Sequence, residues 1–451
     1  MNASQLSSDR DGWHGHPESG VLQSCREELI TDGKRYLPAY GISVLEPFLV
    51  IPLLLFLLTS DEIGVLGTLE ALLVVICGFS QLGVKFAYLQ HVADSGVKDR
   101  GQGFWTATLL TCSVGFAVGA AAGLLLDRLA AEHLIDSRFG VSPLILGALV
   151  MLSNLHMMFV TDLRARRSPQ LFVFSSALRL ALLLVLLPLL APDAGSKLDA
   201  VLGTQAVGLL VAIGLIAYFG ALPRLAVPEN MLARNFVSYG FPWAIGSLIK
   251  YGTDALLPWL CLLLISPRVA GAMALASKTA AIFDAGFGLP FMMAWGGRVY
   301  EWLKHRTIRQ VMPALSRQIA WVSFAAALIA ILIGAIMLGR SVNDEDLLWQ
   351  ALCLLPFAVF NKMLFALRSP ASAGLLIKRD MRWNIRYGVA GLLLFGCLGP
   401  LAIVASGAIG GWSMFVLIEA ALLLHMARRG MTCLRSTHMG ELMPAAMEAR
   451  P

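Results

Sequence analysis

The sequence predicts an all-helical protein that crosses a membrane about 12 times, in two halves of six helices each. Of its 451 residues, 57% are hydrophobic and 14% are charged, whereas a soluble domain carries about 25% charged residues. Apolar stretches long enough to span a bilayer, which takes ~20 residues, recur along the whole chain. Basic residues gather in alternate loops between these stretches, as a positive-inside topology requires.

The apolar stretches are separated by short loops, which leave no room for a folded domain outside the membrane. The predicted spans are residues 38–58, 63–84, 104–126, 141–161, 171–191, 200–222, 237–265, 268–296, 318–338, 348–367, 383–405 and 408–427. This division predicts a polar cytoplasmic N-terminal tail (1–36), a first six-helix bundle (37–222), a cytoplasmic linker (223–236), a second bundle (237–427) and a cytoplasmic C-terminal tail (428–451).

The distribution of Lys and Arg predicts that both termini are cytoplasmic. In that orientation, 25 of the 35 basic residues fall in cytoplasmic segments and 5 in external loops. A missed span would invert every later loop, so the asymmetry also supports the number of spans. The net charge of +6 reflects this topology, and we expect no nucleic-acid partner. None of the 7 cysteines lies in an external loop or in a CxxC pattern, so we expect neither a disulfide nor a metal site.

Weak internal similarity between the halves predicts a parallel repeat about an axis along the membrane normal. Tyr40 and Gly41 precede a span in the first half, and Tyr239 and Gly240 precede the corresponding span in the second. A short loop follows each span, and we align the loop at 60–64 with the loop at 266–271, so that Ser60 matches Ser266. Both halves then enter the membrane from the same side.

Prolines interrupt the first span of each half. Proline removes a backbone hydrogen bond and kinks a helix, and interrupted helices at matching positions are a good sequence pointer to a transport site. The alternative is that proline is simply more frequent in membrane helices. The predicted hinges are Pro47 and Pro52 in the first span, and Pro242 and Pro258 in the seventh.

Ten charged residues fall inside the predicted spans. Each costs about 2.5–3.5 kcal/mol at a helix centre, so we expect them to pair or to face an aqueous cavity. Arg386 is close enough to the end of its span to reach the interface. The acids are Glu46, Glu70, Asp254, Asp284 and Glu419, and the bases are Arg179, Lys250, Lys278, Lys362 and Arg386.

The second half holds the densest group of these charges. Lys250 and Asp254 are four residues apart, so they share a helix face, and Lys278 and Asp284 lie on the next span. One interpretation is that the charges only neutralise one another. The other is that they line a cavity, where the acids would handle a coupling cation and the bases would hold an anionic group of the substrate.

Two bases of the cavity group, Arg179 and Lys362, have no acid within four residues on their own helices. Unpaired bases in a cavity suit a phosphate-bearing substrate. Three acids, Glu46, Glu70 and Glu419, lie on predominantly apolar spans. For these acids, a coupling-ion role and a structural role both stay open.

Residues 239–301 resemble the polysaccharide flippases (O-antigen and exopolysaccharide) of the multidrug/oligosaccharidyl-lipid/polysaccharide (MOP) exporter superfamily. The resemblance lies in short motifs, and the sequence departs from the family pattern at Ala255, where an Arg often follows the helix-seven Asp. The matching residues are Tyr239-Gly240-Phe241-Pro242, Asp254, Gly271, Lys278, Pro290-Phe291, Ala294-Trp295 and Tyr300-Glu301.

This resemblance implies a V-shaped fold of two bundles, like that of the multidrug and toxin extrusion (MATE) proteins, whose cavity opens to each side in turn. It implies a multi-pass protein of the bacterial inner membrane that flips an oligosaccharide on undecaprenyl-pyrophosphate for lipopolysaccharide or exopolysaccharide biosynthesis. The cavity bases would hold the pyrophosphate, and an Na⁺ or H⁺ gradient or the membrane potential would drive the movement. A polysaccharide polymerase and a chain-length regulator are the implied partners, beside membrane lipids.

Two alternatives stay open. A cation-coupled small-molecule exporter of the multidrug type needs an acidic, aromatic site, whereas acids and bases are equally frequent in these spans. A membrane enzyme or subunit of a polysaccharide assembly complex usually needs a long external loop, and the longest predicted here is only residues 127–140. We therefore expect a transporter rather than an enzyme.

Overall fold

The computed structural model describes residues 17–95, 100–132, 139–165, 169–190, 197–220, 222–302, 306–377 and 382–436, and these residues form helices joined by short connections. The first half contains α1 (Pro17–Leu57), α2 (Ser60–Ser80), α3 (Val84–Ser95), α4 (Arg100–Ala131), α5 (Pro143–Ala165), α6 (Pro169–Leu190) and α7 (Lys197–Phe219). The second half contains α8 (Asn230–Leu264), α9 (Pro267–Phe283), the π-helix η2 (Asp284–Gly288), α10 (Leu289–Trp302), α11 (Arg306–Ser341), α12 (Glu345–Ala371), α13 (Ala373–Ile377) and α14 (Arg382–Ser436).

These helices account for the twelve predicted spans. Among the described residues, 8 helical segments are long and apolar enough to cross a membrane, and Val44–Leu57 and Tyr251–Leu264 are shorter apolar helices at the predicted first and seventh spans. One long segment, Ile385–Leu434, consists of two helices joined at Ser406 and Gly407, where the backbone is not helical. The helix that runs from α9 through η2 into α10 supplies the remaining span.

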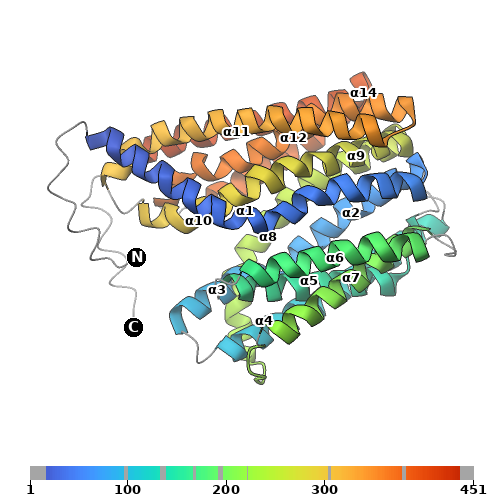
Figure 1. Cartoon of the computed structure of the whole chain (residues 1–451), viewed down its shortest axis with the longest axis horizontal. Coiled ribbons are helices and arrows are strands. Elements are labelled where there is room, and N and C mark those ends of the chain that lie inside the picture. The colour runs from blue at the N-terminus through green and yellow to red at the C-terminus, as the bar shows by residue number, and fades with distance from the viewer. Residues whose placement is uncertain are drawn as a thin grey trace.

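The helices form two groups, with α8 running between them (Figure 1). One group contains α4, α5, α6 and α7, and the other contains α9, α11, α12 and α14. Helices α1, α2 and α8 have contacts in both halves of the chain. Helix α1 contacts α6 of its own half but also α9, α10 and α11 of the second half, whereas α8 contacts α2 and α3 of the first half as well as α14. Both α1 and α8 therefore pack on helices of the opposite sequence half.

Helices α2 and α9 meet along a seam between the halves. A Cβ atom on Gly64 would collide with the carbonyl oxygen of Pro267, and a Cβ atom on Gly271 would collide with that of Ser60. Small residues allow helix backbones in a membrane to approach this closely. The reciprocal contacts show that Ser60 corresponds to Pro267.

The helix caps correct the predicted alignment of the two halves by one residue. Thr59 caps α2 by accepting a hydrogen bond from the backbone of Glu62, and Ser266 caps α9 by accepting one from Val269. Thr59, and not Ser60, is therefore the counterpart of Ser266. The sequence alignment was wrong here because either hydroxyl residue satisfies an N-cap preference.

The seam is closed at one end only. Along α2, Gly64 and then Gly67 lie against α9, but further along Gly78 lies against Tyr251 of α8. Helices α2 and α9 therefore separate away from the end where both begin. According to the predicted orientation, the closed end is external and the separated end is cytoplasmic.

The N-terminal region differs from the predicted polar tail. Residues 17–36 continue the first span as a single helix, α1, and residues 428–436 likewise extend α14. The apolar residues of the α1 extension, which recur at helical spacing, are Val21, Leu22, Cys25 and Leu29. They pack on Trp295, Trp302, Met312 and Ala373 of the second half. The N-terminal extension of α1 is therefore a docked structural element. Residues 1–16 and 437–451 lie outside the described part of the chain.

Candidate functional site

Three ion pairs join charges that the sequence places inside the membrane, and each pair connects two different helices. Glu46 of α1 pairs with Arg179 of α6 at 3.3 Å. The Nζ atom of Lys278 in α9 lies 2.5 Å from Glu70 Oε2 in α2, and that of Lys362 in α12 lies 3.2 Å from Asp284 Oδ2 in η2. Partners on neighbouring helices thus lower the free-energy cost of placing these charges in the membrane.

The expectation that Arg179 and Lys362 lack acidic partners is therefore wrong. Helical spacing reveals only neighbours on the same helix, and both bases find their acids across a helix–helix contact. Glu46 had no recognisable partner in the sequence for the same reason. A substrate anion at any of these bases would therefore compete with a carboxylate.

A cavity of about 280 Å³ lies between α1 and the helix formed by α9, η2 and α10. Three of the predicted site residues line it, namely Glu46, Lys278 and Asp284. At ~30 Å³ for each water of the liquid, this is room for roughly nine water molecules or a small polar group. The remaining lining residues are Pro47, Val50, Ile51, Ala281, Ala285 and Leu289.

The carboxylate of Asp284 is positioned by an irregular turn of the helix. Residues Asp284–Gly288 form a π-helix in which the N–H of Leu289 donates to the carbonyl of Asp284. Pro290 follows directly, and because proline has no N–H it cannot complete the α-helical bond at this point. π-turns of this kind are frequent at functional sites, and this one carries a cavity acid.

Asp254 lies on α8, near the pair formed by Lys362 and Asp284. Its side chain is exposed, and both Asp254 and Tyr251 interact electrostatically with Lys362. The side chain of Lys250 lies outside the described residues, so the predicted pair between Lys250 and Asp254 stays a prediction. Among the described residues, the structure brings Asp254 toward a base on α12.

Glu419 belongs to a different place in the fold. Its side chain is buried and pairs with Arg368 of α12, within the second half. This pair favours the structural interpretation of Glu419.

The predicted hinge prolines do not interrupt their helices in this structure. Helix α1 is continuous through Pro47 and Pro52, and α8 is continuous through Pro242 and Pro258. Pro47 is buried against the cavity, whereas the side chain of Pro242 lies outside the described residues. A hinge role for these prolines stays a prediction.

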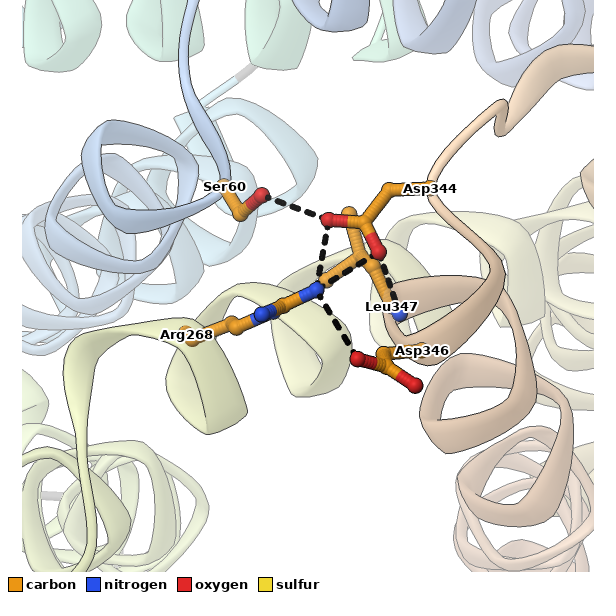
Figure 2. Close-up of polar contacts among 5 residues, drawn as sticks. All are labelled: Ser60, Arg268, Asp344, Asp346 and Leu347. Atoms are coloured by element: carbon orange, nitrogen blue, oxygen red, sulfur yellow. Dashed lines mark hydrogen bonds and ion pairs between the residues drawn. The ribbon is translucent and has the colours of Figure 1, made fainter.

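A polar cluster at the closed end of the seam, which we call the outer clamp, was missed by the sequence analysis (Figure 2). Arg268 donates to both carboxylate oxygens of Asp344 at 2.6 and 2.7 Å and pairs with Asp346 at 3.5 Å. Ser60 Oγ donates to Asp344 Oδ2 at 3.4 Å. Because Ser60 begins α2, the outer clamp ties the first half to the second.

Asp344 also begins α12, where it accepts a hydrogen bond from the backbone N–H of Leu347 at 3.2 Å. This bond, together with the Arg268 guanidinium and the Ser60 hydroxyl, holds the pKa of Asp344 below its ordinary value. The signal for it in the sequence is an Asp directly before the acidic first turn of a helix, which is a preferred N-cap.

A second missed cluster lies in the first half, toward the end where α5 finishes. The buried carboxylate of Asp162 accepts a hydrogen bond from Tyr88 at 2.6 Å and two from Arg100 at 2.8 and 2.9 Å. It connects α3, α4 and α5. An Asp at the end of an otherwise apolar span was the available signal.

Comparison with known proteins places the fold. No protein-family model matches the chain, and no curated protein sequence matches it. Among solved structures, the chain is similar to an inward-facing multidrug resistance MATE family transporter of the MOP superfamily. The TM-score is 0.68 and the sequence identity is 13%, over 89% of this chain and 96% of that one. It has the MATE fold. The expectation of a multi-pass fold of this kind is thereby confirmed.

Other MATE structures resemble the chain to a similar degree. A mutant of the Vibrio cholerae MATE transporter VcmN matches with a TM-score of 0.65 and 14% identity over 93% of this chain and 99% of that one. A MOP superfamily transporter from Pyrococcus furiosus, described as having a binding pocket of reverse polarity that suggests a different function, matches with a TM-score of 0.59 and 11% identity, over 92% and 98%.

Proposed function

We propose that this protein is a membrane transporter that moves an oligosaccharide, linked to undecaprenyl-pyrophosphate, across the bacterial inner membrane for polysaccharide biosynthesis. The observation that supports it best is the cavity between α1 and α9, where Lys278 faces the space while an acid of another helix holds it. A transporter is favoured over an enzyme because the fold is that of MATE transporters.

Alternating access suits the asymmetry of the seam. Close packing of Gly64 and Gly271, together with the outer clamp, seals one end, and α2 lies against α8 rather than α9 at the other. Substrate would enter from the separated, cytoplasmic end. Opening of the sealed end would then release it to the outside.

A phosphate-bearing substrate suits the three described bases. A pyrophosphate offers several charged oxygens, which form stronger hydrogen bonds than neutral acceptors do. When Arg179, Lys278 or Lys362 turns to such a group, its carboxylate is freed, and a coupling H⁺ or Na⁺ would neutralise that carboxylate. In this proposal Glu46, Glu70 and Asp284 take the cation. A polymerase and a chain-length regulator are the proposed partners.

A cation-coupled multidrug exporter is the second candidate. It is favoured by the lining of the cavity, where the two acids Glu46 and Asp284 face one base, Lys278. Multidrug resistance is also the activity named for one of the similar structures. An exporter of cationic drugs would need the acids and would work without the bases.

The test uses a strain that lacks the gene and carries variants of it on a plasmid. Lys278→Gln, Arg179→Gln and Lys362→Gln should each abolish or strongly reduce surface glycan while the protein stays in the membrane. Lys197→Gln, which removes a base that donates to the backbone carbonyl of Leu57 at the end of α1, is the matched control and should leave glycan unchanged. Normal glycan in all three variants, with drug susceptibility raised by Glu46→Gln, would instead establish the exporter.

A further inference from the structure

We propose that Glu70 and Lys278 form a lock that the substrate operates. An anionic group that enters the cavity takes Lys278 away from Glu70 and thereby releases the seam between α2 and α9. This inference rests on the proposed function and adds the step that connects the cavity with the outer end of the protein.

The lock joins the two halves directly. Glu70 lies on α2 and Lys278 on α9, and their charged atoms are 2.5 Å apart, with 24% of each side chain exposed. Charge-assisted bonds of this length are strong when water is partly excluded. Separation of α2 from α9 requires that this bond be broken.

The lock follows the glycine contacts of the seam along α2. Moving along α2 from its start, Gly64 lies against Pro267 and Gly271, and Gly67 against Ala274. Glu70 comes next, against Lys278. Glycine and alanine contribute little dispersion energy of their own, because they have few side-chain atoms. The ion pair is therefore the one charge-assisted interaction among these three contacts.

Lys278 faces the substrate as well as the lock. It lines the cavity together with Glu46 and Asp284, so its ammonium group is within reach of a ligand there. Glu70 is held from the other side by Gln205 of α7, whose amide donates to Glu70 Oε1 at 3.3 Å. When Lys278 leaves, Glu70 keeps this bond and stays with the first half.

The competition for Lys278 supplies the differential affinity that any ligand-driven change requires. An anion binds Lys278 fully only when Glu70 has been released, so it binds the released state more tightly than the locked state. The population therefore shifts toward release of the seam as the anion concentration rises. A neutral ligand has no such preference.

The experiment measures the separation of the outer ends. Spin labels are attached to the full-length protein without its native cysteines. One label is at Glu132→Cys, near the end of α4, and the other is at Arg340→Cys, near the end of α11. Both positions are exposed. Inter-label distances are recorded by double electron–electron resonance in lipid nanodiscs with inorganic pyrophosphate as the probe. Pyrophosphate should move the distribution toward longer distances, and glucose, a neutral solute, should not.

Three variants test the role of the lock. Glu70→Gln removes the competitor, so it should show long distances without pyrophosphate and bind it about tenfold more tightly. Lys278→Gln removes the anion-binding group, so it should show long distances that pyrophosphate does not change. Glu419→Gln breaks the ion pair with Arg368, away from the seam, and should behave as the parent does.

Equal pyrophosphate affinity in the parent and in Glu70→Gln would overturn the lock, as would pyrophosphate binding without any change in distance. Surface glycan is scored separately. If Lys278→Gln makes normal glycan while pyrophosphate still opens the outer end of the parent, the proposed substrate is wrong and the lock stands. If glycan is lost but the distances never respond, the substrate proposal stands and the lock is wrong.

Discussion

Ser60 and Asp344 connect the two halves of the protein at the end where α2, α9 and α12 begin. The Ser60 hydroxyl donates to the carboxylate of Asp344 at 3.4 Å, and the same carboxylate is held by Arg268. The outer clamp therefore depends on the charge of one aspartate.

Protonation of Asp344 should open the outer end. Because its pKa is lowered in the folded protein, the clamp contributes its full stabilisation above the ordinary Asp pKa of about 4 and loses it as pH falls through the lowered value. Distances between spin labels at Glu132→Cys and Arg340→Cys should therefore lengthen as the pH is reduced from 7 to 3. Asp344→Asn should show long distances throughout, and a pH response preserved in this variant would contradict the assignment.

The glycine seam should not tolerate a side chain. Gly64→Ala places a methyl group against the backbone of Pro267, where no side-chain rotation relieves the collision, so we expect a loss of about 1–3 kcal/mol. Thermal unfolding in detergent measures it. Gly203→Ala and Gly214→Ala are the matched controls, because a Cβ atom at either position meets nothing within 4 Å. Equal melting temperatures in all three variants would show that the seam is loosely packed.

The docked N-terminal extension of α1 should protect Cys25. Burial, together with the nearby charge of Glu28, raises the pKa of the Cys25 thiol from 9.0 to about 11, which lowers its thiolate fraction at pH 8 roughly hundredfold. A protein with Cys25 as its sole cysteine should react very slowly with maleimide. Leu22→Ser, which weakens the packing of the extension on the second half, should speed the reaction. Rapid labelling of the unmodified protein would mean that the extension is not docked.

The predicted orientation has a direct test in intact cells. Single cysteines at Lys197 and Arg340 should react with an impermeant thiol reagent, because both positions lie at the end that the charge distribution predicts to be external. Cysteines at Ser168 and Arg306 should be protected until the cells are broken. Labelling of Arg306→Cys in intact cells would reverse the orientation.

The prolines of α1 and α8 are expected to permit switching between states. Pro47→Ala and Pro258→Ala should leave the protein inserted but slow the appearance of surface glycan, because a helix without the proline resists bending. The amount of protein in the membrane is measured beside glycan. Full export by both variants at normal protein levels would show that these prolines are incidental.

The sequence predicted the spans well, because hydropathy and loop charge report on the solvent around each segment. It predicted the contacts between spans poorly. Lys278 was expected to share a site with Asp284, and both do line one cavity, yet the ion pairs run from Lys278 to Glu70 and from Lys362 to Asp284. Partners on different helices depend on how the helices cross, and a single sequence carries no record of that crossing.

The same reason explains the missed outer clamp. Ser60, Arg268 and Asp344 lie at the starts of three different helices, each of which follows an ordinary short turn. Only the packing of α2 on α9 brings the three together. The N-terminal extension is harder to recognise for a different reason. Its apolar residues recur at helical spacing, but they are too few to form a membrane span.

The contacts that α1 and α8 make with the opposite half have a consequence for assembly. A polypeptide that ended at the linker would leave α1 without the α9–α11 surface that covers it, and a polypeptide that began there would leave α8 without α2 and α3. Each fragment would expose to lipid a helix face that is charged or closely packed in the whole molecule. Neither half should therefore fold stably without the other. Two separately synthesised fragments should be degraded when alone and rescued when made together.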